Sequence, residues 1–317
     1  EKEEYPMIED SKFSEIDGIF ITHAHLDHCG YLPHIYTAGY SKTVYATKPT
    51  IELTNVLLSD YMHISNPQNV TKEGLEKLHK SYKIIEYNKP FKLNDLEITF
   101  IPAGHIVGSA MIKVSDGKKS ILYTGDIHLA KTRLLDGAAV DGISSDTLVT
   151  ESTYASKNDV FEKESAIAKS MLKSINDTID AGGKIIIPSF AVGRAQEVLL
   201  FLDEYIDSGI VRKVPIYVDG MINKSMRIYR HNVIYCRDEL QKKILMSDYD
   251  PFKSSNFVPV EKKSMRGKIV SEDQSNIIVT TSGMLTGGPV MYYLSKMAGN
   301  SANKLILVGY QAEGTLG

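Results

Sequence analysis

Tryptophan is absent from this 317-residue sequence, and cysteine occurs only twice, at Cys29 and Cys236. Two cysteines cannot build the disulfide framework of small secreted domains, so we expect an intracellular, cytoplasmic protein. No apolar run approaches the roughly 20 residues that a membrane-spanning helix needs, and no signal peptide is visible. The sequence therefore excludes a disulfide scaffold and predicts a protein that has no membrane partner.

A strong excess of one charge is also missing, because the formal net charge is −3. This balance argues against a basic coat for nucleic acid over the whole surface. The length predicts two domains, which we place at residues 1–160 and 161–317. The first is acidic and the second mildly basic, which suits a cation site beside an anionic-substrate surface. Ordinary scatter of charge explains the difference equally well.

Three apolar runs in the first part of the chain each stop at one polar side chain. They are residues 16–22, 120–125 and 146–150, which run into His23, Asp126 and Glu151. Each run reads as a buried strand that delivers a polar group just past its carboxyl end. If the three strands lie side by side, these groups meet at one sheet edge, where α/β proteins place ligands.

The remaining pattern changes character halfway along the chain. In the first part we expect further strands at 43–47 and 96–102 and helices at 49–64 and 71–81. The second part alternates strands at 184–188, 214–218, 276–280 and 304–308 with helices at 161–181, 193–205, about 219–231 and 289–297. This alternation predicts an α/β domain with a mostly parallel sheet flanked by helices. Residues 235–275 are too irregular to assign.

The strongest chemical signal is the run His23-Ala24-His25-Leu26-Asp27-His28. In an extended segment, residues two apart share a face, so His23 and His25 can bind one cation. A turn after Leu26 would direct Asp27 and His28 towards a second cation. Imidazole with carboxylate favours zinc over iron or manganese, and two metals about 3.5–4 Å apart form a clamp for phosphoryl chemistry.

Two later residues can complete such a centre. His105 lies in the small-residue loop 103–109, and Asp126 follows a strand. A carboxylate at that place can bridge two metals, which a neutral histidine seldom does. A lone loop histidine or aspartate is usually structural, so it is the cluster at 23–28 that favours His105 and Asp126 as ligands.

These residues resemble the metallo-β-lactamase superfamily, whose signature is His-x-His-x-Asp-His followed by a later histidine and aspartate. Other motifs narrow the resemblance to its β-CASP branch of RNA-processing nucleases, at residues 151–154, 188–197, 282–289 and 309–315. The nearest match is the archaeal homologues of the cleavage and polyadenylation specificity factor endonuclease, with RNase J more distant. The resemblance implies a metallo-β-lactamase-type αββα domain and a β-CASP α/β domain.

The same resemblance implies a ligand set for two Zn²⁺ ions. His23, His25 and His105 would bind the first ion, Asp27 and His28 the second, and Asp126 would bridge them. Glu151 matches an acidic residue that supports a catalytic histidine in this family. The implied activity is that of an endoribonuclease, with 5′–3′ exonuclease activity in addition, acting on single-stranded RNA in 3′-end processing or decay. A homodimer is left open.

Both ends of the chain look cut, because it begins without Met and stops in a Gly-rich stretch. The family's first strands would precede Glu1, and its return segment would follow Gly317. None of the nine histidines matches the family's catalytic histidine or its last zinc ligand. We therefore expect the metal-binding domain to be incomplete at both ends and the activity of this chain to be in question.

Several residues are candidates for contacts with the substrate. Arg194 at a helix start can meet a phosphate, although a structural ion pair is the alternative. The loop with Ser282 and Gly283 can hold a phosphate or simply make a tight turn. Lys131 and Arg133, just past Asp126, are candidates for the substrate cleft. No aromatic stacking platform is evident.

Three other functions remain open. A small-molecule metallohydrolase, such as a lactonase or thioesterase, shares the metal motif but does not explain the second domain with Arg194. An iron redox protein on the same scaffold typically has an acidic residue where this chain has His25. A non-catalytic RNA-binding or partner-binding subunit usually loses motif ligands, which this chain retains.

Overall fold

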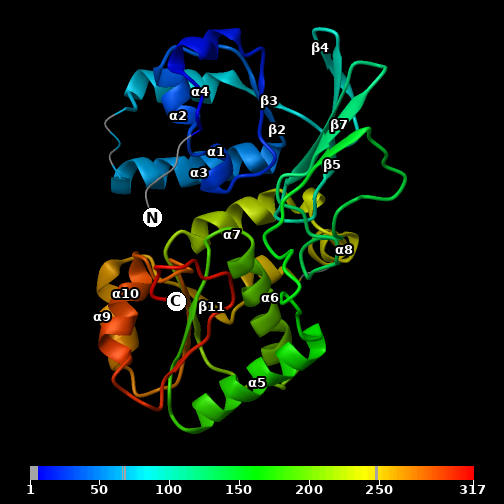
Figure 1. Cartoon of the computed structure of the whole chain (residues 1–317). Helices are drawn as coiled ribbons and strands as arrows, with labels where there is room; N and C mark the ends of the chain where they lie inside the picture. The colour runs from blue at the N-terminus through cyan, green and yellow to red at the C-terminus, as the bar shows by residue number, and fades with distance from the viewer. Residues whose placement is uncertain (1–5, 66, 68, 247–248) are drawn as a thin grey trace. The chain divides into compact units, whose positions relative to one another are not determined.

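The computed structural model describes residues 6–65, 67, 69–246 and 249–317. It divides the chain into two compact units (Figure 1). Unit 1 contains the residues up to Thr153 together with the segment His231–Asp238, and unit 2 contains Tyr154–Arg230 and Glu239–Gly317. The segment His231–Asp238 thus packs with unit 1, whereas its position in the sequence placed it in the second predicted domain.

Unit 1 is built on two sheets and their helices. Its helical elements are η1 (Asp10–Glu15), α1 (Leu26–Cys29), α2 (Leu32–Thr37), α3 (Lys48–Ser65), α4 (Lys72–Ser81) and η2 (Val233–Tyr235). A parallel sheet has the order β1 (Ile19–Phe20), β2 (Val44–Ala46), β3 (Tyr82–Ile84). The second sheet has the order β4 (Phe91–Leu93), β5 (Leu96–Pro102), β6 (Ala110–Ser115), β7 (Ser120–Tyr123), β8 (Thr147–Val149). Its pairs are antiparallel except for β7 with β8.

The core of unit 1 follows from the two-residue alternation of β5. Ile98 and Phe100 point to one face and pack with Tyr45 of β2. Ile101 points to the opposite face and packs with Met111 and Leu122. Because successive strand residues face opposite sides, β5 supplies apolar side chains to a cluster on each face of the sheet.

One predicted arrangement is only partly right. Of the strands that precede His23, Asp126 and Glu151, β7 and β8 pair side by side, but β1 belongs to a different sheet. The two sheets nevertheless meet, since the Ala110 N–H of β6 donates to the Thr22 carbonyl at 2.7 Å. This bond brings the end of the β1 strand beside the second sheet.

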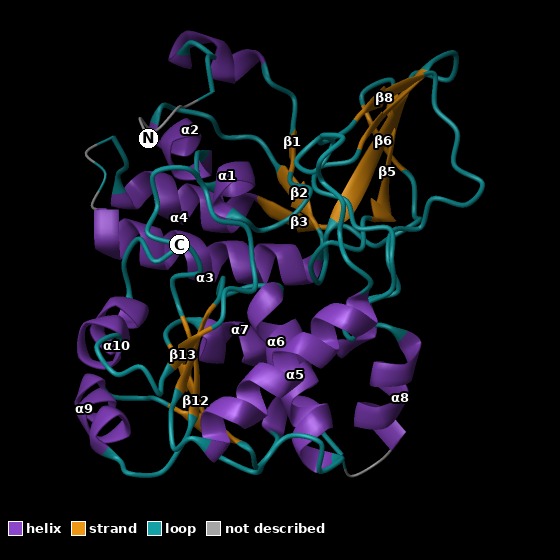
Figure 2. Cartoon of the chain, turned by 60° about the horizontal axis from the view of Figure 1, so that its bottom comes forward, coloured by secondary structure: helices purple, strands orange, loops and turns teal. Residues whose placement is uncertain are grey.

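Unit 2 is an α/β unit whose strand pairs are all parallel. Its sheet has the order β11 (Phe257–Pro259), β10 (Ile216–Asp219), β12 (Ile277–Thr280), β9 (Ile185–Pro188), β13 (Lys304–Leu305). Its helical elements are α5 (Glu164–Asp180), α6 (Arg194–Asp207), α7 (Ile222–His231), α8 (Asp238–Met246), η3 (Pro251–Lys253), α9 (Lys263–Ser271) and α10 (Pro289–Met297). Helices α9 and α10 lie on one side of the strands and α5 and α6 on the other (Figure 2). The predicted parallel sheet with flanking helices is confirmed.

The strands of unit 2 are buried on both faces. Every residue of β9, β10 and β12 is buried, as expected for central strands covered by helices on each side. The unassigned residues 235–275 contain α8, η3, β11 and α9, which are too short to show a clear period. Nowhere in the described ranges is a helix both long and apolar enough to cross a membrane.

A buried charge ties the sheet of unit 2 to two helices. Asp219, at the end of β10, accepts hydrogen bonds from Arg266 Nε at 2.7 Å and Nη2 at 3.0 Å. The Tyr293 hydroxyl of α10 donates to the same carboxylate at 2.8 Å. Because Asp219 is almost completely buried, its charge depends on these partners for compensation.

We therefore expect Arg266→Met to lower the free energy of unfolding by about 3–5 kcal/mol, because it leaves a buried carboxylate without its cation. Arg212 is the matched control, since it makes the same two-pronged contact with Asp180 at 3.0 Å but on the exposed surface. Arg212→Met should cost less than about 1 kcal/mol. Denaturant unfolding of both variants measures the difference, and equal losses would contradict this role for Asp219.

Candidate metal centre

The His23–His28 motif occupies the junction between β1 and α1. The chain leaves β1 at Phe20 and remains extended at His25, which caps α1 with φ −62° and ψ 146°. Helix α1 then begins at Leu26, where the sequence predicted a turn. The backbone thus changes from extended to helical between His25 and Leu26. This change lets His23 and His25 point in a different direction from Asp27 and His28, as expected for ligands of two cations.

The His105 loop between β5 and β6 is closed by one serine. The Ser109 hydroxyl accepts hydrogen bonds from the backbone N–H groups of His105 at 3.1 Å and Ile106 at 3.2 Å. Gly104 has φ +70°, and a Cβ there would lie 2.4 Å from backbone atoms of residues 128, 137 and 138. The loop is therefore fixed from within by Ser109 and packed closely against its neighbours at Gly104.

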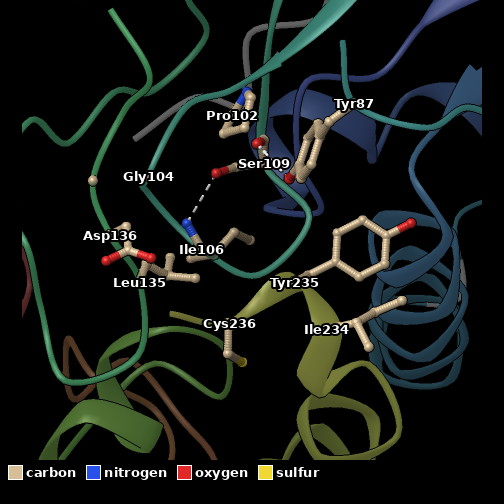
Figure 3. A pocket seen from close by; sticks show the side chains of 11 residues that line it. Tyr87, Pro102, Gly104, Ile106, Ser109, Leu135, Asp136, Ile234, Tyr235 and Cys236 are labelled. Atoms are coloured by element: carbon tan, nitrogen blue, oxygen red, sulfur yellow. Dashed lines mark hydrogen bonds between the residues drawn. The ribbon is translucent and has the colours of Figure 1, made fainter. Parts of the chain in front are cut away.

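A cavity of about 200 Å³ in unit 1 lies against this loop (Figure 3). Gly104, Ile106 and Ser109 line one part of the cavity, and Tyr235 and Cys236 from the segment His231–Asp238 line another. The Tyr87 hydroxyl donates to the Ser109 carbonyl at 2.8 Å, as the dashed lines in Figure 3 show. The segment His231–Asp238 thus lies against the same cavity as the His105 loop.

Asp126 follows β7 and is placed by its two neighbours along the chain. Gly125 has φ +55°, and a Cβ there would come within 2.7 Å of the Thr22 side chain, so only glycine allows this close approach. On the other side, the Ile127 N–H donates to Glu151 Oε1 at 3.0 Å. Glu151 also accepts from the Thr153 N–H at 3.3 Å, so it ties the end of β8 to the residue after Asp126.

Four of the predicted ligands come together at one point. One ligand atom from each of His23, His25, His105 and Asp126 lies within 4.8 Å of the other three. His25 Nδ1 and His105 Nε2 are 3.1 Å apart. Asp126 Oδ2 lies 3.4 Å from His105 Nε2 and 3.6 Å from His23 Nε2.

Of the other two predicted ligands, His28 faces the second oxygen of the same carboxylate, and Asp27 pairs with His28. His28 Nε2 lies 3.2 Å from Asp126 Oδ1 and 3.3 Å from Asp27 Oδ2. The two oxygens of Asp126 therefore point to different groups of side chains. This is the arrangement that a carboxylate bridging two cations needs.

The buried His23 imidazole tests whether these residues fit a cation. His23 is fully buried, and its Nδ1 pairs with the Thr22 hydroxyl at 3.1 Å. Its Nε2 has no hydrogen-bond partner among the residues that the structure describes. Leaving such an atom unpaired costs about 1–3 kcal/mol, whereas imidazole nitrogen is a preferred zinc ligand. The second imidazole nitrogen is held by Thr22, as in metal sites with outer hydrogen bonds. The donor set therefore fits a cation.

The pKa values of the histidines also differ between the group at Asp126 Oδ2 and the group at Asp126 Oδ1. Burial, followed by the neighbouring His25, lowers the pKa of His23 far below its ordinary value and that of His105 to about 4. Burial alone would also lower the pKa of His28, but hydrogen bonds to Asp126 and Asp27 raise it to about 9. Without metal at pH 7, His23 and His105 are neutral, whereas His28 carries a proton.

The predicted substrate residues lie outside this cluster. Lys131 is exposed and pairs with Asp136 at 3.0 Å in the loop after Asp126, which also carries Arg133. In unit 2, exposed Arg194 opens α6 after β9. The Ser282 hydroxyl accepts from the Thr286 N–H at 3.1 Å, so this side chain closes its own loop.

Other features of the site were not singled out by the sequence. Thr22 and Ser109 hold His23 and the His105 loop, and only the small-residue composition of 103–109 gave a signal. The Ser189 hydroxyl, just after β9, is buried without a hydrogen-bond partner in the described parts of the chain. Cys29 is buried and donates to the Ala24 carbonyl at 3.3 Å, so it packs in the interior.

Comparison with protein families assigns both parts of the chain. Residues 3–154 match the metallo-beta-lactamase superfamily domain, and residues 195–317 match the Beta-Casp domain.

Similar curated proteins come from several archaea and are called transcription termination factor FttA. The protein of Methanothermobacter thermautotrophicus is 40% identical over all of this chain and 51% of its own length. Those of a Lokiarchaeum species and Pyrococcus horikoshii are 37% and 38% identical over 99% and 95% of this chain, and 50% and 48% of their own lengths. The chain therefore spans about half the length of the curated relatives it matches.

Removing one ligand should reduce metal content selectively. We expect His105→Gln to lower the bound zinc by about one ion per chain, because it removes a nitrogen from the group around Asp126 Oδ2. His79→Gln on α4 is the control, since His79 is an exposed histidine outside the cluster. Elemental analysis of the purified variants measures the ratio, and equal zinc in both would contradict this assignment.

Metal binding should release a proton from His28. This imidazole must lose its proton before it can donate a lone pair, and its pKa of about 9 means that it is protonated at pH 7. Affinity for the ion at Asp27 and His28 should therefore rise up to about tenfold per pH unit below pH 9. Calorimetry in buffers of different ionisation enthalpy counts the protons, and affinity that is independent of pH would contradict the expectation.

Proposed function

This chain belongs to the β-CASP branch of the metallo-β-lactamase superfamily, and on that premise we propose that it is a zinc-dependent phosphodiesterase that cleaves RNA. The observation that carries the proposal is the convergence of four imidazoles around the Asp126 carboxylate, with the Asp27 carboxylate beside one of them. A superfamily motif alone would leave the substrate open, whereas the β-CASP match supports RNA.

The proposed centre has one position on each side of Asp126. His23, His25 and His105 would hold one zinc ion, and Asp27 and His28 a second. Bound metal supplies an activated water near neutral pH and stabilises the charge that develops on phosphoryl oxygens. Thr22 fixes the orientation of the His23 ring, and Glu151 fixes the backbone after Asp126.

Asp27 has the right exposure to handle a proton at the rim of this centre. Its side chain is 77% exposed, whereas the neighbouring His28 is largely buried. The hydrogen bond to His28 lowers the pKa of Asp27, so its carboxylate is ionised near neutral pH. A carboxylate oxygen of Asp27 is therefore able to accept a proton from an incoming water.

We also propose phosphate contacts in each unit. In unit 2, Ser189 and Arg194 lie where β9 leads into α6, and Gly283 lies in the loop after the adjacent strand β12. An arginine beside free backbone N–H groups at a helix start can bind a phosphate. In unit 1, we propose the exposed Lys131, which pairs with Asp136, and Arg133 two residues further on.

The names of the relatives support an RNA substrate and a setting at the 3′ end of transcripts. We propose single-stranded RNA as the substrate and endonucleolytic cleavage, with additional 5′–3′ exonuclease activity, in 3′-end processing or decay. Because the relatives are about twice as long as this chain, these activities are proposed for the protein as a whole.

Asp126→Ala should abolish RNA cleavage, with a loss of at least about 100-fold, while binding of RNA is retained. Glu151→Gln should lose about 10- to 100-fold, because it acts through the backbone after Asp126. His79→Gln serves as the control with unchanged cleavage. The assay follows an internally labelled single-stranded RNA in the presence of zinc.

The same experiment also tests esters and lactones as substrates. Hydrolysis of these small substrates without cleavage of RNA would indicate a small-molecule metallohydrolase and overturn the proposal. Cleavage of RNA by Asp126→Ala at the parent rate would show that the cluster around Asp126 is not the catalytic centre.

A further inference from the structure

Three exposed aromatic rings meet on the surface of unit 2. Tyr154, Phe161 and Tyr310 are 50%, 67% and 50% exposed. The ring centres of Tyr154 and Phe161 are 5.0 Å apart, and those of Tyr154 and Tyr310 are 6.3 Å apart. We call this group the aromatic triad. Only the fold brings it together, because Tyr310 is far from the other two in the sequence.

The rings of the aromatic triad are not stacked on one another. The interplanar angles are 80° and 77°, so neighbouring rings meet edge to face. Exposures of half or more leave a large part of each residue open to solvent. Open aromatic surface of this kind is costly to keep in water unless a partner covers it.

One hydrogen bond and one close backbone approach connect the chain around Tyr310 to the proposed phosphate residues of unit 2. Gln311, the neighbour of Tyr310, donates its Nε2 to the carbonyl of Gly283 at 3.0 Å. A Cβ at Gly283 would lie 2.9 Å from the backbone N of Phe190, so the loops after β12 and β9 touch. Ser189 precedes Phe190 in the second of these loops. The Tyr310 ring is therefore attached to the same loops as the buried, unpaired Ser189 hydroxyl.

One residue of the triad also lies close to Glu151 along the chain. Tyr154 follows Glu151 by three residues, which can span at most about 10 Å. Glu151 holds the backbone next to Asp126. Tyr154 is therefore separated by only two residues from the residue that holds the backbone after Asp126.

We propose that Tyr154, Phe161 and Tyr310 form a stacking platform for the bases of single-stranded RNA. The proposal rests on the proposed function and specifies how its substrate is held. A nucleotide combines a flat base with a phosphate, and unit 2 offers flat rings beside a loop with Ser189 and Arg194. Stacking tolerates any base, because every base has a π-face. A protein segment is a less good match, since it would not use the phosphate-type loop.

Removal of the rings should weaken binding through the bases only. We expect Phe161→Ala and Tyr310→Ala each to weaken binding of an oligouridine by about 5- to 100-fold. Binding of an abasic ribose-phosphate oligomer of the same length should not change. Tyr292→Ala is the control, because Tyr292 is a 37% exposed ring on α10 outside the triad. Fluorescence anisotropy with the whole chain measures all affinities.

A single tryptophan gives a direct readout of stacking. The chain contains no tryptophan, so Phe161→Trp introduces a unique fluorophore into the triad. The oligouridine should quench its fluorescence, whereas the abasic oligomer should not. Tyr292→Trp reports from outside the triad and should not respond to either oligomer.

The outcomes separate the platform from the proposed function. If the parent chain binds and cleaves RNA but the triad variants bind as it does, the platform is wrong and the nuclease proposal stands. Equal weakening of oligouridine and abasic oligomer would show a backbone contact instead of stacking. If the parent binds no RNA, the triad is assigned to a protein contact and the platform is rejected, while the cleavage assay judges the nuclease proposal by itself.

Discussion

The proposed metal centre of unit 1 depends on where the two oxygens of the Asp126 carboxylate lie. Oδ2 faces His23 and His105, and Oδ1 faces His28. The surroundings serve this placement: Gly125 lets the end of β7 approach Thr22, and Glu151 holds the backbone that follows. Because the ligands come from two different sheets, the bond between Ala110 and Thr22 that joins those sheets is a condition for the centre. His23 Nε2 is buried and has no hydrogen-bond partner among the described residues, which supports a cation at this place.

Unit 2 contributes a different kind of chemistry. Its parallel sheet is buried on both faces, and Asp219 with Arg266 and Tyr293 ties the strands to α9 and α10. On this rigid frame, the loops after β9 and β12 present small and polar residues, and the aromatic triad lies beside them. The proposals thus place the metal centre in unit 1, the aromatic triad in unit 2 and phosphate contacts in both units.

The sequence was most informative where spacing is short. The six ligands could be proposed because four lie within His23–His28, and the parallel sheet of unit 2 because its strands are continuous runs of β-branched residues. Features that depend on distant contacts could not be predicted in this way. Tertiary packing alone produces three of these features. They are the place of β1 in another sheet, the hydrogen bonds that Ser109 accepts from the His105 loop and the contact between Tyr154 and Tyr310. The secondary structure of residues 235–275 could not be predicted for a local reason, because their helices and strands are too short to show a hydrophobic period.

The central claim is that Asp126 bridges two metal ions held by the other five ligands. X-ray absorption at the zinc edge of the zinc-loaded chain tests it most directly. The account predicts nitrogen and oxygen ligands at about 2.0–2.2 Å and a zinc–zinc distance of about 3.5–4 Å. The metal–metal signal should disappear in Asp126→Asn. A single zinc environment without a metal–metal vector, or a vector that survives Asp126→Asn, would contradict the account.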